Sequence, residues 1–315
     1  MTLAEKIIAK ASGKKSVDPG DILEVNVDLA LIHELTGPLA LKVMEELGVK
    51  KVWDPNRVVI VLDHLVPADS VKTAGLHALM RKFAREQGIK NFYEVGRGGI
   101  CHQVLVENGH VKPGMLVVGA DSHTCTAGAL GAFAVGVGST DMGGVLATGR
   151  MWLMVPETLK IEVKGRIKHP LTPKDVILHI LGGVGVSGAL YKAVEFTGET
   201  VKAMSMDGRL TMCNMAVEMG AKTGIIEPDE ITLKFLVDEA GVHPGDIQPL
   251  KSDPNANYED VISFDISDLE PQIALPPSPS NVKPVSEVEG TPINQAFIGS
   301  CTNGRLEDLR VAARI

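Results

Sequence analysis

Three short segments combine acid–base or nucleophilic side chains, and each follows an apolar run typical of a buried strand. Asp63-His64 follows RVVIVL, Asp121-Ser122-His123 follows MLVVGA, and Cys301-Thr302-Asn303 follows QAFIGS. A carboxylate beside an imidazole fixes the ring tautomer and raises its pKa, so such a histidine can donate a proton near neutral pH. Because parallel strands present their carboxyl ends at one edge of a sheet, we expect the three segments to line one crevice. Each Asp-His pair taken alone also fits a helix cap beside a surface histidine.

Two further ionisable residues are candidates for the same crevice. His102 follows the glycine-rich segment 96–101, which suggests backbone held close to a ligand, although a buried, hydrogen-bonded histidine fits equally well. Glu195 alternates with apolar neighbours in the segment AVEFTGE, which indicates a strand. Taken alone, that pattern favours a carboxylate on a solvated strand face.

The same side chains also fit metal chemistry. Five of them could hold one or two divalent ions, which would make a hydrolase: Asp63, His64, His102, Asp121 and His123. Cys301, at a strand end just before a helix, fits either a nucleophile or an iron–sulfur ligand. The other cysteines lie in small-residue or apolar surroundings typical of packing: Cys101, Cys125 and Cys213.

Two glycine-rich segments look like nucleotide sites but lack the required context. Residues 183–188 fit GxGxxG, with Asp207 about twenty residues further on, yet they follow a predicted helix over 172–181 instead of a strand. Glycines that end that helix are the better interpretation. Residues 136–144 lack the Lys-Ser/Thr of a phosphate-binding loop.

The elements that must position these residues alternate between strands and helices, which predicts an α/β fold. Apolar alternation and β-branched runs predict strands over 22–32, 57–64 and 114–123, and a new section starts at 160–168. Helical periodicity and capping residues predict helices over 2–11, 37–49, 70–87 and 172–181. Small residues over 127–151 predict a tightly packed helix beneath a loop, and the Pro- and Ser-rich segment 269–290 predicts a linker without packed elements.

Composition excludes several classes of protein. The 315 residues carry a net charge of −8, which argues against a nucleic-acid partner. No apolar run approaches the length of a membrane span, and the N-terminal segment has no apolar core of a secretory signal. Four cysteines do not make a disulfide framework, so we expect a reducing, cytoplasmic setting.

Six segments together resemble the aconitase superfamily, in the family's order and over essentially the whole chain. Within it they are most similar to large subunits of the two-subunit 3-isopropylmalate dehydratase and homoaconitase type. DSHT and GSCTN are the most specific matches. The six segments are VLDHLVP (61–67), GICHQV (99–104), GADSHTCTAGALGAFAVGVGSTD (119–141), AVEFTGE (193–199), MDGRLTMCNMAVEMGAKTG (206–224) and FIGSCTNGRLEDLR (297–310).

The resemblance implies three-layer α/β domains with mixed sheets, over 1–158 and 159–280, with 281–315 as a linker and the start of an incomplete third, cluster-binding domain. It implies dehydration and rehydration of a small hydroxy di- or tricarboxylic acid through an unsaturated intermediate, as in the conversion of 2-isopropylmalate to 3-isopropylmalate in leucine synthesis. It implies a [4Fe-4S] cluster as Lewis acid and a separate small subunit, which supplies a serine base and much of the substrate selectivity.

Site roles follow from the resemblance residue by residue. Asp63-His64 looks like the pair that protonates the departing hydroxyl. His102, Asp121 and His123 look like the shell around the iron-bound water, with Glu195 paired to one of these imidazoles. Cys301 is similar to the first cluster ligand, and three residues are expected to contact substrate or the adjacent turn: Ser122, Asn303 and Arg305.

The chain departs from the family in its cysteines. The family's other two cluster ligands form a Cys-x-x-Cys well after GSCTN, and this chain has neither of them in the fourteen residues that follow Cys301. We therefore expect that the chain alone does not hold a stable cluster, either as part of a longer subunit or as a truncation without activity. The alternatives are homoaconitase or a related hydro-lyase, a divalent-metal hydrolase, and an inactive scaffold that binds the small subunit.

Overall fold

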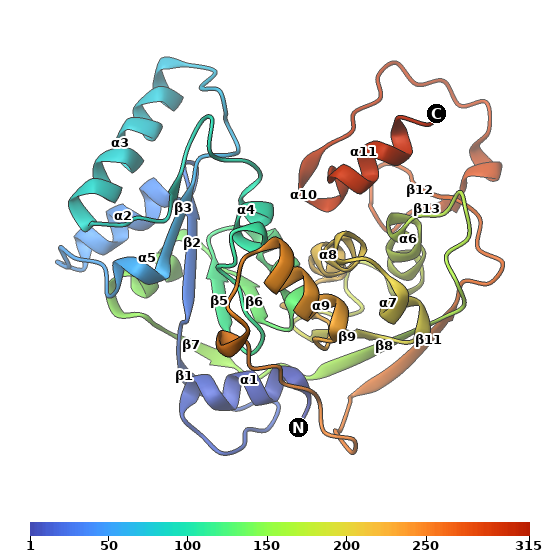
Figure 1. Cartoon of the computed structure of the whole chain (residues 1–315), viewed down its shortest axis with the longest axis horizontal. Coiled ribbons are helices and arrows are strands. Elements are labelled where there is room, and N and C mark those ends of the chain that lie inside the picture. Colours follow the sequence, from blue (N-terminus) through green and yellow to red (C-terminus); the bar gives the residue numbers. More distant parts are fainter.

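The computed structural model describes all 315 residues, and its left half is organised around a five-stranded parallel sheet (Figure 1). The strand order is β4–β3–β2–β5–β6, and all four neighbouring pairs are parallel. In chain order the strands proceed from β2 to one edge and then from β5 to the other, so loops diverge between β2 and β5 and leave a crevice at their carboxyl ends. The strands are β2 (Leu29–His33), β3 (Val58–Val61), β4 (Phe92–Tyr93), β5 (Leu116–Gly119) and β6 (Phe133–Gly136).

The three inner strands are buried along their whole length, which is why their sequences read as continuous apolar runs. Helices cover both faces: α2, α3 and α5 lie on one side and α4 on the other (Figure 1). The predicted strands at 57–64 and 114–123 and the predicted helices at 37–49 and 70–87 are therefore confirmed. The helices are α2 (Gly37–Glu46), α3 (Val71–Gln87), α4 (Cys101–Glu107) and α5 (Ser139–Thr148).

A second parallel sheet, of four strands in the order β10–β9–β8–β11, forms the other half. Two small antiparallel pairs, β1–β7 and β12–β13, complete the strands. The α/β class is confirmed. Each sheet is either entirely parallel or entirely antiparallel, so no single sheet is mixed. The bounds are β1 (Ile22–Asn26), β7 (Arg150–Met154), β8 (Thr158–Lys164), β9 (Ala193–Thr197), β10 (Thr223–Ile225), β11 (Asp260–Asp265), β12 (Gln272–Ala274) and β13 (Val282–Pro284).

Capping residues set the helix ends that the sequence predicted. Thr2 and Glu5 form a reciprocal capping box at α1 (Leu3–Ser12), and Thr172 and Asp175 form one at α6 (Pro173–Val184). Gly185 follows α6 with a positive φ, so the glycines of 183–188 do end a helix. The remaining helical turns are η1 (Pro55–Arg57), η2 (Ser122–Leu130), α7 (Glu199–Ala203), α8 (Met206–Asn214), η3 (Met215–Met219), α9 (Glu230–Lys234), η4 (Phe235–Glu239), η5 (Pro244–Asp246), η6 (Val285–Val288), α10 (Ser300–Asn303) and α11 (Leu306–Ala312).

The two sheets meet where η2, which follows β5, packs against α8 and β10. Gly128 of η2 lies so close to β10 that a Cβ there would be 1.8 Å from the carbonyl oxygen of Gly224, so only glycine fits. One apolar cluster includes Leu31 of the first sheet and Ile161 of the second, so packing is continuous across the expected boundary. The division into 1–158, 159–280 and 281–315 stays a prediction.

Two predicted elements near the N-terminal half are wrong in detail. The segment 22–32 is two strands: β1 alternates between exposed and buried residues and pairs with β7, whereas β2 is fully buried at the centre of the sheet. The segment 127–151 is a 3-10 helix, a strand and a helix, because the small residues of η2 let it pass close beneath β10 and leave room for β6.

Two expectations at the C-terminal end are also wrong. The segment 269–290 contains the β12–β13 ribbon, whose Val282 packs against the main apolar cluster beside α6. The run before Cys301 is not a strand, since Phe297 and Ile298 are exposed and no strand lies alongside to pair with them. No helix is both long and apolar enough to cross a bilayer.

Arg209 should be a major source of stability. Its fully buried guanidinium donates to both carboxylate oxygens of Asp229 at 2.6 Å, to Thr232 and to the carbonyl of Lys202. Asp229 is one third exposed, so water partly compensates its charge when Arg209 is removed. Because the buried hydrogen bonds to Thr232 and to the carbonyl of Lys202 are lost as well, we expect Arg209→Met to lower the free energy of unfolding in urea by about 2 kcal/mol.

The control is Arg150→Met, the same substitution at an exposed arginine paired with Glu24. Exposed pairs contribute about 0–1 kcal/mol, so this variant should unfold like the wild type. Equal, small effects of both substitutions would contradict a stabilising role for the buried pair.

Candidate active site

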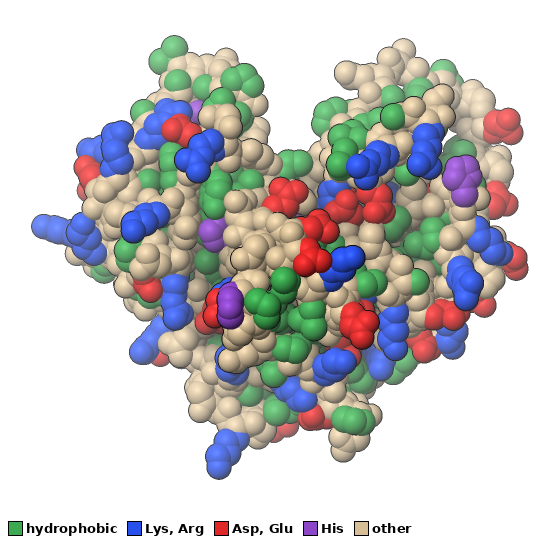
Figure 2. Space-filling view, viewed as in Figure 1, with side chains coloured by type: hydrophobic (Ala, Val, Ile, Leu, Met, Phe, Trp, Pro, Cys, Tyr) green, Lys and Arg blue, Asp and Glu red, His purple; other side chains and the backbone are tan.

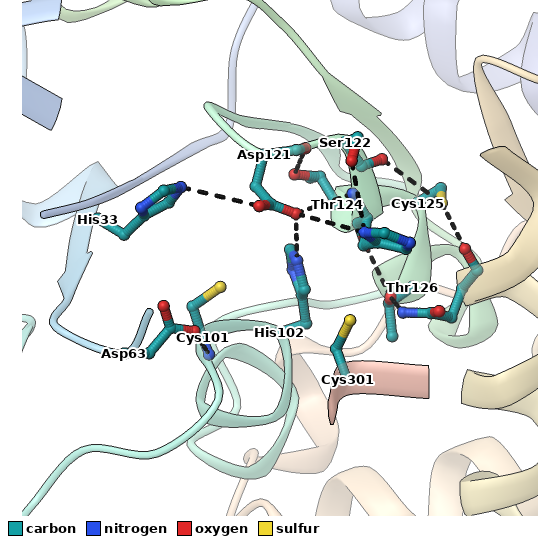
Figure 3. Close-up of polar contacts among 12 residues, drawn as sticks. His33, Asp63, Cys101, His102, Asp121, Ser122, Thr124, Cys125, Thr126 and Cys301 are labelled. Carbon is teal, nitrogen blue, oxygen red and sulfur yellow. Dashed lines mark hydrogen bonds and ion pairs between the residues drawn. The ribbon is translucent and has the colours of Figure 1, made fainter. Parts of the chain in front are cut away.

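One carboxylate, that of Asp121, lies among four imidazoles at the carboxyl end of β5. Figure 3 shows two of these rings, His33 and His102, directed toward it. Its Oδ1 accepts a hydrogen bond from Nε2 of His102 at 2.7 Å and from the backbone N–H of His123 at 2.8 Å. Its Oδ2 lies 3.4 Å from Nε2 of His64 and 3.8 Å from Nε2 of His33. Burial alone would raise the pKa of Asp121, but the bonds from His102 and His64 outweigh burial and hold it far below its usual value.

Asp63 positions the helix that carries His102. Its Oδ2 accepts the backbone N–H of Cys101 at 2.6 Å, in the first turn of α4, and this bond places the next residue, His102, under Asp121. Despite burial, which raises it, the pKa of Asp63 lies below its usual value because His64 and this N–H donate to the carboxylate. The buried Nδ1 of His102 has no hydrogen-bond partner within the chain.

His64 lies between two carboxylates. Hydrogen bonds to Asp121 and Asp63 raise the pKa of His64 to about 10, against the opposing effect of burial. Its ring stacks on that of His33, with centroids 4.0 Å apart. Burial, and then the charge on His64, lower the pKa of His33. The stacked pair is therefore one imidazolium and one neutral imidazole at neutral pH.

Glu34 supports the loop after β3 from below. It is fully buried, and its two oxygens accept the backbone N–H groups of Asp63, at 3.0 Å, and Leu65, at 2.6 Å. These bonds fix the backbone on both sides of His64, so the carboxylate sets where the imidazolium stands.

His123 has a different carboxylate partner, Glu218, which is at 3.4 Å from its Nε2. The hydrogen bond from His123 lowers the pKa of Glu218. Ser122 is exposed, and its Oγ lies 3.4 Å from Nδ1 of His123. The exposed Ser122 and half-buried His123 thus lie at the open side of the group.

Cys301 approaches the same group from α10 (Figure 3). It is partly buried, burial raises the pKa of its thiol, and it lines a cavity of about 460 Å³. The next residue, Thr302, donates to Oδ1 of Asn214 at 2.9 Å, and Asn214 donates to Thr126 of η2 at 2.8 Å. This chain of bonds ties α10 to α8 and to the segment that begins at Asp121.

The other predicted contact residues near Cys301 already have protein partners. Oδ1 of Asn303 accepts a hydrogen bond from Nζ of Lys174 at 3.4 Å. Arg305 is 7% exposed, and its guanidinium makes four hydrogen bonds within the chain. Contact of either side chain with substrate stays a prediction.

Glu195 is not brought into this group. It lies on β9, buried and not solvated, and its oxygens accept hydrogen bonds from Ser252 at 2.7 Å and Tyr258 at 2.8 Å. The expected pairing of Glu195 with an imidazole is wrong; Glu218 has that place beside His123. The bond from Ser252, which also accepts the N–H of Leu3, gives Glu195 a structural setting.

Four residues of the group were not found from the sequence: His33, Glu34, Asn214 and Glu218. His33 is the last residue of the buried strand β2 and Glu34 follows it, so the rule that found Asp63 and Asp121 applies to them as well. The predicted strand ended at residue 32, so this signal was present in the sequence, although neither residue was selected. Asn214 ends α8 and Glu218 lies in η3, and nothing in their spacing points to the site.

The ligand atoms of His33, Glu34, Asp63 and His64 lie within 4.8 Å of one another, as in a metal site. However, both oxygens of Glu34 accept backbone hydrogen bonds, and Nδ1 of His64 is bonded to Asp63. A divalent ion would have to displace these bonds, which does not favour the hydrolase alternative.

The thiols of the chain do not make a complete ligand set for a [4Fe-4S] cluster. Cys301 fits as one ligand, since it is partly exposed and lines a cavity. Cys101, Cys125 and Cys213 are at most 1% exposed, and burial raises the pKa of each, that of Cys125 to about 12. Three-cysteine ligation therefore needs two thiolates besides these four residues.

The two carboxylates beside His64 predict that its ring is protonated at neutral pH, which can be measured. We expect the ring protons of His64 to titrate in NMR spectra with a midpoint near 10, so that the ring stays charged from pH 6 to 8. Asp121→Asn removes one partner and should move this midpoint toward its usual value. A His64 midpoint of 7 or below in the wild type would contradict the arrangement.

The same pKa makes stability depend on pH. A histidine whose pKa is raised from 6.5 to about 10 on folding contributes stability in full below pH 6.5 and loses it as pH rises toward 10. Between pH 7 and 10, the free energy of unfolding of the wild type should therefore fall more steeply than that of His64→Gln. His243→Gln, at an exposed histidine in no ion pair, should keep the wild-type slope.

Comparison with known proteins assigns the chain to one family. The family model of the aconitase family (aconitate hydratase) matches residues 5–290. The chain is 54% identical to 3-isopropylmalate dehydratase large subunit 1 of Methanopyrus kandleri, over all of this chain and 74% of that protein.

Two proteins of Methanothermobacter thermautotrophicus are also similar, each over all of this chain and 74% of its own length. One, at 56% identity, is named probable 3-isopropylmalate dehydratase large subunit, and the other, at 51%, probable methanogen homoaconitase large subunit. The match spans most of the chain and the identity is far above 30%, so the chain belongs to the aconitase family.

Proposed function

We propose that this chain is the large subunit of a 3-isopropylmalate dehydratase, which isomerises 2-isopropylmalate to 3-isopropylmalate through an unsaturated intermediate in leucine synthesis. The carrying observation is the imidazolium of His64, held between Asp63 and Asp121. Relatives at 54% and 56% identity with this name support the choice of substrate.

The chemical problem is the loss of hydroxide from carbon, which needs a proton at the leaving oxygen. His64 supplies it in this proposal: the ring is charged at neutral pH and one third exposed, so its proton is available to a bound hydroxyl. Asp63 holds Nδ1, which fixes the ring's orientation, and Asp121 stabilises the charge on the other nitrogen. Rehydration uses the same group in reverse.

The two other pairs, His102 with Asp121 and His123 with Glu218, bind and orient the departing or entering water in this proposal. Both carboxylates can only accept hydrogen bonds, so each ring presents an N–H to its carboxylate. Nδ1 of His102 is buried, whereas the ring of His123 is partly exposed. The base that removes the carbon-bound proton, and part of the substrate's carboxylate recognition, belong to a small subunit. The relatives' names, as large subunits, support such a partner.

Cys301 is proposed as one ligand of a [4Fe-4S] cluster, which supplies Lewis-acid chemistry in the resembling family. The cavity beside it and its partial exposure support this role. An oxygen-sensitive cluster fits a cytoplasmic setting. Substrate contacts by Ser122 and Asn303 belong to the same proposal.

The second candidate is a homoaconitase, which a relative at 51% identity favours. Its substrate class differs in the side chain, a carboxylate in place of a branched alkyl group. The choice between them is a test of specificity and not of mechanism.

The test is turnover by the chain fused to the C-terminal segment of a relative, which supplies the missing thiolates, reconstituted anaerobically with iron and sulfide and combined with a small subunit. Turnover is followed by the ultraviolet absorbance of the unsaturated acid. We expect 2-isopropylmalate to be turned over faster than homocitrate. His64→Ala should lower kcat by about 100-fold or more, since the proton donor is lost, with an unchanged circular dichroism spectrum.

Three results would contradict parts of this proposal. Turnover of His64→Ala within tenfold of wild type would remove His64 as the proton donor. Faster turnover of homocitrate would favour the second candidate. Binding of the small subunit without turnover of either acid would favour a scaffold.

Cys301→Ser should abolish iron retention, because serine is a poor ligand for iron–sulfur clusters. The measurement is iron and sulfide content after reconstitution of the chain with the C-terminal segment of a relative fused to it. Cys213→Ser, at a buried thiol that does not line the cavity, is the control and should retain the wild-type content. Unchanged iron in Cys301→Ser would exclude Cys301 as a ligand.

A further inference from the structure

Arg305 is the most heavily bonded side chain at the turn that carries Cys301. Its Nε donates to Oε1 of Gln103 at 2.8 Å, and its Nη1 donates to Thr211 at 3.2 Å and to the carbonyl of Thr302 at 2.7 Å. Its Nη2 donates to the carbonyl of Cys301 itself at 2.9 Å. The side chain is 7% exposed.

These four bonds use four of the five N–H groups of a guanidinium, so little of Arg305 remains for a bound acid. Two of the acceptors are backbone carbonyls of the turn, at Cys301 and Thr302. The other two lie on separate helices, Gln103 on α4 and Thr211 on α8. Arg305 therefore links one turn to two rigid elements.

The two helical partners of Arg305, Gln103 and Thr211, each lie close in the chain to a residue of the site or of its support. Gln103 is the residue after His102, and Thr211 lies one turn before Asn214, which accepts from Thr302. We infer that Arg305 is a positioning residue that fixes the Cys301 turn against α4 and α8, and so sets the place of the thiol relative to the histidine group. It does so in place of the substrate contact expected from the resemblance.

Charge in the cavity supports a buried arginine here. The cavity lining includes four carboxylates, those of Glu107, Asp207, Glu239 and Glu307. Figure 2 shows acidic side chains gathered beneath the notch between the α3 side and the C-terminal segment. Asp207 and Asp308 favour the charged form of Arg305, although burial lowers its pKa. A neutral side chain at position 305 would remove the positive charge that lies beside Asp207 and Asp308.

The test measures alkylation of the cluster-free 315-residue chain by iodoacetamide, with each cysteine followed by peptide mass spectrometry. In the wild type Cys301 should react slowly, and the three buried cysteines more slowly still. Arg305→Gln should accelerate Cys301 about tenfold or more, because it removes buried, charge-assisted hydrogen bonds that close the turn. Cys101, Cys125 and Cys213 should keep their wild-type rates.

Two matched variants separate positioning from general packing. Arg305→Lys keeps the charge but reaches fewer acceptors, so it should restore part of the protection. Arg310→Gln, at an exposed arginine of the same cavity lining, should behave like the wild type. Equal acceleration of all four cysteines in Arg305→Gln would indicate general unfolding and overturn the inference, as would a Cys301 rate within twofold of wild type.

Gln103→Met gives a second measurement should Arg305→Gln fail to fold. It removes the acceptor of Nε from a partly exposed position on α4, so it should accelerate Cys301 alone by a smaller factor. An unchanged rate would overturn the link to α4. The inference rests on the proposed function only for the importance of Cys301, and alkylation requires no turnover, so the two can fail separately.

Discussion

The carboxylate of Asp121 is the point on which the site depends, because all four imidazoles have a ring nitrogen within 4.0 Å of its oxygens. Hydrogen bonds to Asp121 and Asp63 raise the pKa of His64, whereas burial and the charge on His64 lower the pKa of His33. The stacked pair therefore separates into a charged donor and a neutral neighbour. That separation is what acid–base chemistry at neutral pH requires.

Backbone N–H groups hold the carboxylates of the site in place, in addition to the side-chain contacts. Asp63 accepts an N–H of α4, Glu34 accepts two from the loop after β3, and Asp121 accepts one from η2. Each bond fixes the segment that presents the next histidine. Buried acceptors without these partners would cost free energy, so the network is both the scaffold and the reactive group.

Strand order explains why these segments converge. The divergence of the chain between β2 and β5 opens a crevice at the carboxyl ends of β2, β3 and β5, and His33, Asp63 and Asp121 all stand there. The second sheet adds its own part through close packing of η2 on β10 at Gly128. That contact lets α8 bring Asn214 within reach of Thr126 and Thr302.

The sequence by itself determined the α/β class, the buried strands β3 and β5, the capped helices, and the polar residues that follow those strands. These features are local: apolar runs, capping boxes and strand ends are visible within about ten residues. The family resemblance added candidate roles, including those of His102 and Cys301. It also offered Glu195 as the partner of an imidazole, which the fold does not allow.

Tertiary structure alone decided which carboxylate meets which imidazole. Glu195 and Glu218 are both acidic residues near apolar runs, and only the packing of α8 and η3 against η2 places Glu218 beside His123. Likewise, the run before Cys301 has strand composition but no neighbouring strand, and a strand exists only when paired. Arg305 was expected from the resemblance to contact substrate, yet it is buried, and two of its acceptors come from residues about 100 and 200 positions away. Contacts at such separations leave no local signal.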